Sequence, residues 1–119
     1  MMKFVNLKDN GKLVSDEFTD EYKKGRGYGS VTIGSDHLFI KKGLKAYCIS
    51  YNDADRIFRR VRRVNAQMCC DNGELELEYL VVSADGRELI EAELPGKKAA
   101  RMLMDDLKGT AEGVEFGAP

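Results

Sequence analysis

The sequence predicts a mainly β fold of the α+β class. We expect a curved antiparallel meander of about six or seven strands, curled into a small barrel and closed by one C-terminal amphipathic helix. Three observations lead to this expectation. From Gly29 onward, turn signals follow one another at short intervals. Between them lie apolar or alternating runs of strand length, and a clear helical period comes only near the end of the chain.

Length and charge limit the classes of protein to which this chain can belong. The 119 residues suffice for one compact domain. Lys and Arg number 19 against 20 Asp and Glu, so the net charge of −1 gives no overall attraction to nucleic acid or anionic lipid. The N-terminus lacks the apolar core of a signal peptide, and no run reaches the roughly 18 apolar residues of a membrane span. We expect a cytoplasmic protein.

Residues 30–51 predict the first strands. The run SVTIG (30–34) places Val31 and Ile33 on one face, and a Gly-Ser-Asp turn then leads into HLFIKK (37–42). KAYCISY (45–51) is rich in aromatic and β-branched residues, which favour strands. These runs predict a short first hairpin followed by a third strand.

Residues 71–94 predict a second hairpin. ELELEYLVVS (74–83) follows a DNG turn (71–73); it begins with strict alternation and becomes apolar on both faces. One end of this strand is therefore expected to be half exposed and the other end buried. The ADG turn (84–86) then returns the chain through the alternating run RELIEAEL (87–94).

The run KKAARMLMDDLKG (97–109) predicts the closing helix. Its apolar residues recur at the helical spacing i, i+3, i+4 and i+7; they are Ala100, Leu103, Met104 and Leu107. Pro95-Gly96 stops the preceding strand, and Gly109 suits the position just past the end of a helix. We predict one amphipathic helix of about three turns.

The two ends of the chain carry weaker signals. Residues 1–28 form an N-terminal extension with a short edge strand at FVNL and a short helix that begins at an N-cap, Ser15. Residues 29–109 make up the domain itself. Residues 110–119 form a loosely held tail, in which Val114 and Phe116 are suited to covering a sheet edge.

The stretch DRIFRRVRRV (55–64) carries the highest density of charge. Five arginines fall within eight residues: Arg56, Arg59, Arg60, Arg62 and Arg63. Read as a helix, the stretch places Ile57, Val61 and Val64 on one side, whereas neither face of a strand is cleanly apolar. The hairpins on either side nevertheless favour a long, bent strand that needs a bulge.

Two interpretations of these arginines stay open. In the first, Arg59 and Arg63 meet a row of glutamates across the hairpin, and the patch is a structural surface of opposite charges. That row consists of Glu74, Glu76 and Glu78. In the second, residues 56–63 bind an anionic partner, which could be a nucleic acid, a phospholipid or an acidic protein segment. The slightly acidic net charge argues against nucleic acid.

Signals for catalysis or metal binding are weak. The soft metal ligands are His37, Cys48, Cys69 and Cys70, and they lack the Cys-x-x-Cys spacing typical of zinc sites. Three cysteines cannot all pair, so we expect reduced thiols. A nucleophilic cysteine would have His37 as its only candidate histidine base, and no glycine-rich phosphate motif opens a helix. We therefore predict a protein that is not an enzyme and has no metal or cofactor.

The order of strands followed by a single helix resembles the pleckstrin-homology-like (PH-like) barrel, and small bacterial proteins contain a similar run. The resemblance covers residues 29–108 and rests on the strand count, the Tyr51-x-Asp53 turn, the Asp85-Gly86 hairpin and the terminal helix. Within it, ISYNDADRIFRRV (49–61) resembles the third strand, a tight turn and the fourth strand.

This resemblance implies a binding or scaffolding module for inositol phospholipids or peptides. Lipid-binding members carry clustered basic residues in and beside the first hairpin loop. Here the corresponding loop, residues 34–36, is short and acidic, which argues against an inositol lipid. We predict a non-enzymatic module whose partner is a protein, its own copy included, held through a sheet edge or the helix. The alternatives are an anion- or nucleic-acid-binding regulator using Arg56–Arg63, and a self-assembling structural subunit.

Overall fold

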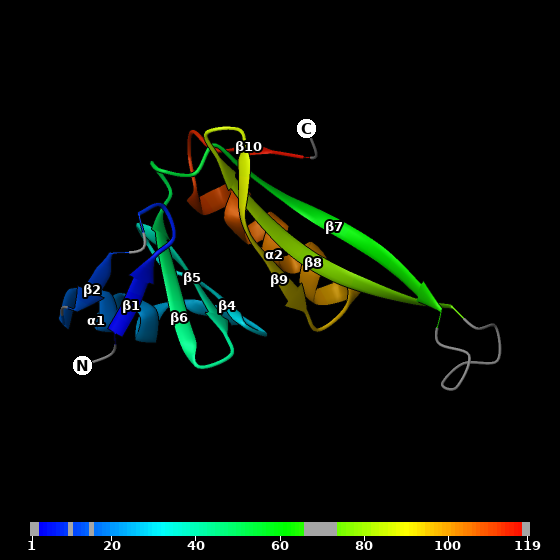
Figure 1. The fold of residues 1–119 in the computed structure, drawn as a ribbon, viewed down its shortest axis with the longest axis horizontal. Coiled ribbons are helices and arrows are strands. Elements are labelled where there is room, and N and C mark those ends of the chain that lie inside the picture. Colours follow the sequence, from blue (N-terminus) through cyan, green and yellow to red (C-terminus); the bar gives the residue numbers. More distant parts are fainter. Residues whose placement is uncertain (1–2, 10, 15, 66–73, 118–119) are drawn as a thin grey trace.

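The computed structural model describes residues 3–9, 11–14, 16–65 and 74–117 and shows an α+β protein made mostly of strands (Figure 1). In chain order, its elements are β1 (Lys3–Asn6), β2 (Lys12–Val14), α1 (Asp16–Lys24), β3 (Arg26–Tyr28), β4 (Val31–Ile33), β5 (His37–Lys42), β6 (Lys45–Ser50), β7 (Arg56–Asn65), β8 (Glu74–Ala84), β9 (Arg87–Leu94), α2 (Lys97–Thr110) and β10 (Glu115–Phe116). No helix in these described ranges is long and apolar enough to cross a membrane.

The strands form two mixed sheets. One sheet has the order β2-β1-β6-β5-β4-β3, and the other has the order β10-β7-β8-β9. The runs β4 to β6 and β7 to β9 are antiparallel hairpin series, as the turn signals predict, and β3 adds a further antiparallel strand beside β4. β1 joins β6 in parallel, and β10 joins β7 in parallel. Consecutive strands β6 and β7 therefore belong to different sheets.

The strand-rich α+β class and the C-terminal helix are confirmed, but the prediction of one meander closed into a barrel is wrong. The two sheets are not joined edge to edge. The edge of β6 is paired with β1 and the edge of β7 with β10, so the backbone groups that barrel closure would use already have partners. The strands number ten within the described ranges because β1, β2, β3 and β10 lie outside the predicted meander, which begins at residue 29.

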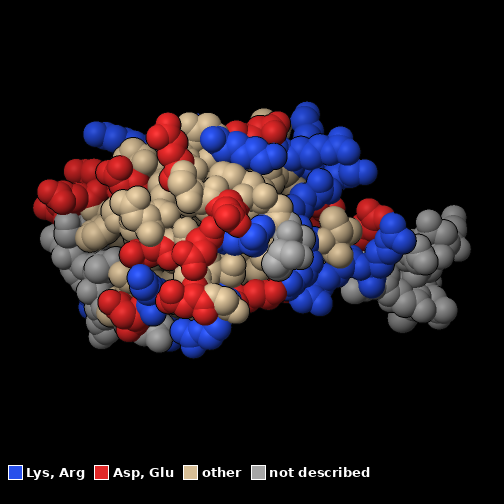
Figure 2. All heavy atoms as spheres, turned by 90° about the horizontal axis from the view of Figure 1, so that it is seen from above, with Lys and Arg blue, Asp and Glu red and all other residues tan. Residues whose placement is uncertain are grey.

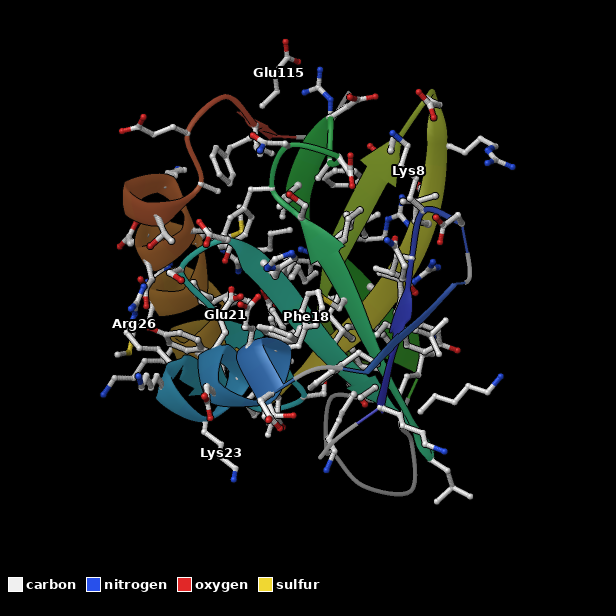
Figure 3. The ribbon with its side chains drawn as sticks, turned by 90° about the vertical axis from the view of Figure 1, so that its left-hand side faces the viewer. Lys8, Phe18, Glu21, Lys23, Arg26 and Glu115 are labelled. Atoms are coloured by element: carbon white, nitrogen blue, oxygen red, sulfur yellow. The ribbon has the colours of Figure 1, made fainter. Side chains whose placement is uncertain are left out.

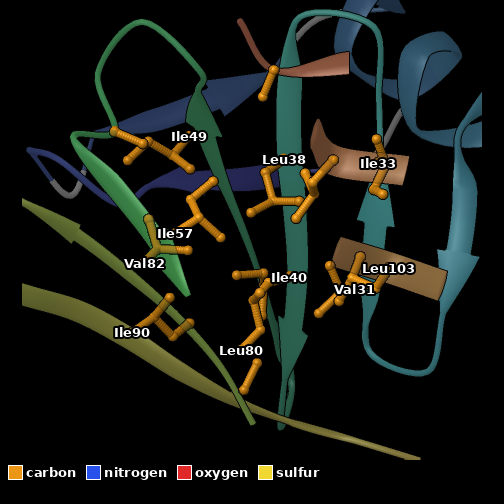
Figure 4. Packing of buried hydrophobic residues seen from close by; sticks show 14 of the residues in the cluster. Val31, Ile33, Leu38, Ile40, Ile49, Ile57, Leu80, Val82, Ile90 and Leu103 are labelled. Atoms are coloured by element: carbon orange, nitrogen blue, oxygen red, sulfur yellow. The ribbon is translucent and has the colours of Figure 1, made fainter. Parts of the chain in front are cut away.

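One core lies between the two sheets and α2 (Figure 4). Alternate residues of β4 to β9 point into it, as the alternation in the sequence predicts. Its buried members include Val31, Ile33, Leu38, Ile40, Ile49, Ile57, Leu80, Val82, Ile90 and Leu103. On α2, Ala100, Leu103 and Leu107 are buried and Met104 is partly buried, which confirms the predicted apolar face.

A polar cluster fastens α2 to the edge strand β3. Arg26 donates from Nε to Asp106 Oδ2 at 2.6 Å and from Nη2 to Asp106 Oδ1 at 2.5 Å, while the Tyr28 hydroxyl donates to Oδ2 at 2.8 Å. Arg26 also reaches the Thr110 hydroxyl at 2.9 Å. The hydrogen bond from Arg26 lowers the pKa of Asp106 most, with a further contribution from Tyr28.

Asp106→Asn is expected to cost about 1–2 kcal/mol of unfolding free energy at pH 7, because it weakens a bidentate, charge-assisted contact. Because the pKa of Asp106 is lowered in the folded state, its ionised carboxylate stabilises the fold at pH values above the unfolded-state pKa of about 4. This stabilisation is lost as the pH falls through the folded-state pKa. Urea unfolding at pH 7 and below pH ~4 should therefore show the difference from wild type shrinking in acid. The neighbouring exposed residue of α2 offers a control, Asp105→Asn, which is expected to change the unfolding free energy at pH 7 by no more than about 0.5 kcal/mol.

The second helix, α1, packs on the opposite face of the six-stranded sheet. Phe4 and Phe39 of that sheet are buried beneath Phe18 and Tyr22 of α1. Glu21 also points toward the sheet, whereas Lys23 points away from it (Figure 3). The predicted short helix in residues 1–28 is thus present, although its predicted N-cap, Ser15, lies outside the described residues.

The C-terminal segment is held more closely than the sequence suggests. Val114 is 7% exposed and belongs to the main core, and Phe116 packs against that core. The backbone amide of Glu115 donates to the Asp55 carbonyl at 3.0 Å, at the start of the parallel pairing with β7. Residues 114–116 therefore cover the edge of β7, the role for which Val114 and Phe116 are suited.

Candidate functional site

The arginine-rich stretch is a strand. β7 pairs with β8 without interruption from Arg56 opposite Ser83 to Asn65 opposite Glu74. The prediction of a strand is confirmed, but the predicted bulge in it is absent from the β7–β8 pairing. An irregularity occurs instead between β8 and β9, at Val82 and Ser83. The DNG turn predicted at residues 71–73 lies outside the described residues.

The two faces of β7 have different surroundings. Ile57 points into the main core, and Arg59 and Val61 follow it on the same face. Phe58, Arg60 and Arg62 occupy the outer face. Neither face is wholly apolar, since both carry arginines. An arginine can nevertheless occupy such a position, because its stem lies along apolar surface while its guanidinium group binds a carboxylate. This arrangement explains why the strand alternation was hard to recognise.

On the inner face, Arg59 forms an ion pair with Glu78 of β8, whose side chain is only 3% exposed. The hydrogen bond that Arg59 donates to Glu78 is the main reason why the pKa of Arg59 is raised. Farther out, Arg63 lies opposite Glu76 and pairs with it at 3.4 Å. Both pairs confirm the predicted contacts with the glutamate row; the side chain of Glu74 lies outside the described residues.

On the outer face, the arginines bind glutamates of β9. Arg60 contacts Glu88 and also Glu91, the latter from Nη1 to Oε2 at 2.7 Å. Arg62 donates from Nη2 to the same Glu91 oxygen at 2.8 Å. Hydrogen bonds from Arg60 and Arg62 lower the pKa values of Glu88 and Glu91, respectively, so these carboxylates stay charged in mildly acidic solution.

These outer ion pairs lie over apolar side chains on the outer face of the sheet. Phe58, Val81 and Glu91 lie in one row across β7, β8 and β9, and the Arg60–Glu91 pair spans that row. The Arg60 guanidinium lies 5.4 Å from the centre of the Phe58 ring. Phe58 is 4% exposed and Val81 is fully buried, although both point to the face opposite the main core. The arginines therefore help to cover this face.

Arg56 serves a third purpose, at the start of β7. Its Nη2 binds Glu115 at 2.5 Å, and its Nη1 donates to the Gly117 carbonyl at 2.9 Å. Both partners belong to the C-terminal segment, so Arg56 fastens β10 to the sheet. Sequence reasoning missed this partner because Glu115 is far away along the chain.

An open groove of about 600 Å³ adjoins this end of β7. It lies between the β6–β7 loop, the β8–β9 turn and the residues before β10. Its charged lining residues are Asp55, Arg56, Arg87, Glu88, Glu112 and Glu115. Carboxylates outnumber guanidinium groups in this lining, so the groove has no electrostatic preference for an anion.

The candidate groups for nucleophilic or metal chemistry that the structure describes, Cys48 and His37, have surroundings typical of residues with a structural role. Burial raises the pKa of the Cys48 thiol to about 12, which disfavours the thiolate that a nucleophile needs. His37 Nδ1 lies 2.8 Å from Glu21 Oε1, and Glu21 Oε2 accepts the backbone N–H groups of Asp36 and His37. Within the described ranges, no group of three or more His, Cys, Asp or Glu could hold a metal ion. Cys69 and Cys70 lie outside them.

The five predicted arginines share one strand, and each of them binds at least one carboxylate in the fold. The partners are Glu115 for Arg56, Glu78 for Arg59, Glu88 and Glu91 for Arg60, Glu91 for Arg62, and Glu76 for Arg63. Basic and acidic atoms likewise adjoin one another over much of the face shown in Figure 2. Comparison of the chain with family models, curated proteins and solved structures found no match, so a functional assignment depends on this geometry.

Proposed function

We propose that this protein is a non-enzymatic binding module whose partner is another protein chain. The contact element is the outer part of the β7–β8 hairpin, residues 61–65 and 74–77, which we call the ribbon. The ribbon carries the proposal because it extends beyond the rest of the fold (Figure 1).

Strand pairing defines where the ribbon begins. β9 accompanies β8 only as far as the pair between Glu78 and Leu94, and β10 pairs only with Arg56 and Ile57. From Arg62 and Leu77 outward, β7 and β8 pair with each other alone, and Val61, opposite Glu78, marks the base of the ribbon. A two-stranded hairpin in water is marginally stable, so a partner that covers it would stabilise it.

The described side chains of the ribbon suit a protein surface. Val61 is 44% exposed on one face, and Leu77 lies on the other face opposite Arg62. The guanidinium groups of Arg62 and Arg63 already bind Glu91 and Glu76. Nucleic-acid binding depends on cations that are free to replace counterions, whereas a protein interface can use apolar side chains among paired charges. These contacts favour a protein partner.

The free edges of the sheets offer less to a partner. The Glu91 carbonyl of β9 accepts a hydrogen bond from Lys42 Nζ at 3.0 Å, and the Glu93 carbonyl accepts one from the Ser30 hydroxyl at 3.3 Å. The irregular pairing near Ser83 also disturbs this edge. The other edge strands, β2, β3 and β10, have two or three residues each. This supports contact through the ribbon rather than edge-to-edge assembly.

The relation to the PH-like superfold belongs to this proposal. The order of β4 to β9 followed by α2 agrees with the order that the sequence resemblance implies. The unjoined sheets and the added strands β1, β2, β3 and β10 depart from a closed barrel. Scaffolding and peptide binding are among the functions known for that superfold, which supports a binding module.

A photo-crosslinking amino acid at position 61 is expected to trap a discrete protein adduct in native cytoplasm. The same amino acid at position 102 is the control, because Met102 is 51% exposed but lies on α2 rather than on the ribbon. Gel mobility and mass spectrometry would report the adducts. An adduct heavier by one further chain of 13.3 kDa would identify a second copy as the partner.

Three results would contradict this proposal. They are the absence of an adduct from position 61, equal adducts from positions 61 and 102, and an adduct that nuclease removes. The last result would instead favour the nucleic-acid alternative. Folding of both labelled proteins is checked by circular dichroism, and no change is expected because Val61 and Met102 are both exposed.

A further inference from the structure

The hairpin between β5 and β6 ends in a fully exposed leucine. Lys42 ends β5 and Lys45 begins β6, so Gly43 and Leu44 form the turn. Gly43 has a φ of 65°, which a tight turn of this kind requires. Leu44 has a relative exposure of 107%, far above Met102 and Val61, the other large exposed hydrophobic residues of the described chain.

Lysines surround this apex. Lys41, Lys42 and Lys45 are exposed on the two strands of the hairpin. Lys3 begins the neighbouring strand β1, two residues before Val5, which pairs in parallel with Tyr47 of β6. We call these four lysines and Leu44 the hairpin tip.

The hairpin tip differs from β7 in the use of its charges. None of its four lysines forms an ion pair with a carboxylate of the described residues, whereas all five arginines of β7 do. Lys42 donates to the backbone carbonyl of Glu91, which neutralises no charge. The tip is therefore a cationic surface with an apolar apex, in a protein whose net charge is −1.

We infer that the hairpin tip docks onto an anionic lipid surface. A convex apex with one leucine needs no matching pocket in a bilayer, because the side chain can enter the boundary between head groups and acyl chains. Lysines with long flexible stems can lie around it and reach several anionic head groups. An acidic protein would have to provide a cavity that fits Leu44. A lipid surface accounts for the lysines and for Leu44 without such a cavity.

The inference does not depend on the proposed protein contact. Figure 1 shows the β5–β6 turn and the outer end of the β7–β8 ribbon at separate extremities of the molecule. A lipid surface at the tip therefore leaves the ribbon free for a second partner. Failure of one interaction would say nothing about the other.

Vesicle co-sedimentation tests the inference directly. The full chain is expected to bind vesicles containing about 30% phosphatidylglycerol in phosphatidylcholine and to dissociate at about 0.5 M salt, where surface charges are screened. Lys41→Gln with Lys45→Gln should weaken binding about 25-fold, taking roughly fivefold for each lysine near an anionic surface. Leu44→Ser should weaken it about tenfold through the loss of apolar burial.

Matched variants on α2 separate this effect from general charge and hydrophobicity. Lys97→Gln with Lys98→Gln removes the same charge from exposed positions, and Met102→Ser removes a comparable exposed apolar side chain. Both are expected to bind like wild type. Lys42 is left unchanged because it also contacts β9.

Several outcomes would overturn the inference. They are a wild-type chain that fails to bind anionic vesicles, equal binding to pure phosphatidylcholine, and tip and α2 variants that bind alike. Soluble polyglutamate is the remaining arm. Binding to it as tightly as to vesicles, with Leu44→Ser having no effect, would identify the tip as a site for an acidic protein instead.

Discussion

Leu103→Ala is expected to destabilise the protein by about 3 kcal/mol, within the range of about 2–5 kcal/mol typical of such deletions in a core. Leu103 lies on α2, is fully buried, and belongs to the cluster in which both sheets meet. Truncation removes apolar contacts and leaves a cavity that the surrounding strands can fill only in part. A loss of this size is a large share of the stability of a small domain.

The neighbouring residue supplies the control for this experiment. Met102 is on the same helix but 51% exposed, and Met102→Ala is expected to change stability by no more than about 0.5 kcal/mol. Both variants are compared with wild type by urea unfolding followed by circular dichroism. Equal effects at the two positions would mean that α2 does not pack against the sheets through the face containing Leu103.

Glu78→Ala is expected to cost about 2–3 kcal/mol, because it leaves the guanidinium of Arg59 without its carboxylate partner. Glu78 is 3% exposed, but the Arg59 side chain is 27% exposed and can regain some hydration. The expected loss of unfolding free energy is therefore smaller than that seen when a fully buried ion pair is broken, which is about 3–5 kcal/mol. Chemical denaturation at neutral pH measures it.

The exposed pair on the same hairpin is the matched control. Glu76→Ala removes the partner of Arg63, whose side chain is 72% exposed, and should cost no more than about 0.5 kcal/mol. A double variant, Arg59→Met with Glu78→Leu, is expected to be more stable than Glu78→Ala alone, because no unpaired charge remains inside. If Glu78→Ala proved as mild as Glu76→Ala, the Arg59–Glu78 contact would have no stabilising role.

The pairing of β7 changes how its arginines are interpreted. The sequence of residues 56–63, taken without the fold, suggests a strongly cationic patch. In the fold, each guanidinium meets a carboxylate, and two of them also lie over aromatic rings, Arg60 over Phe58 and Arg62 over Tyr79. The lysines of the β5–β6 hairpin are less densely spaced in the sequence, yet none of them forms an ion pair with a carboxylate of the described residues. Local charge density is therefore a poor guide to the free cationic surface of this protein.

How well each contact could be predicted depends on how far its partners lie apart. The Arg59 and Arg63 pairs were predictable because β7 and β8 are consecutive strands of one hairpin, which brings opposing residues together. The partners of Arg60 and Arg62 were not, because Glu88 and Glu91 lie on β9 and β8 intervenes. To predict these contacts, one must know that β9 lies beside β8 and that an arginine side chain is long enough to cross β8.

The sequence by itself determined the local elements. A two-residue alternation of apolar and polar side chains encodes a strand, and the spacing of Ala100, Leu103 and Leu107 encodes one helical face; both depend only on near neighbours. The tertiary structure alone decided that β1 and β10 take the edges of β6 and β7, and that the sheets stay separate instead of closing into a barrel. Pairing between segments so far apart depends on which backbone edges remain free once the core has formed, and alternation along a single strand carries no information about that.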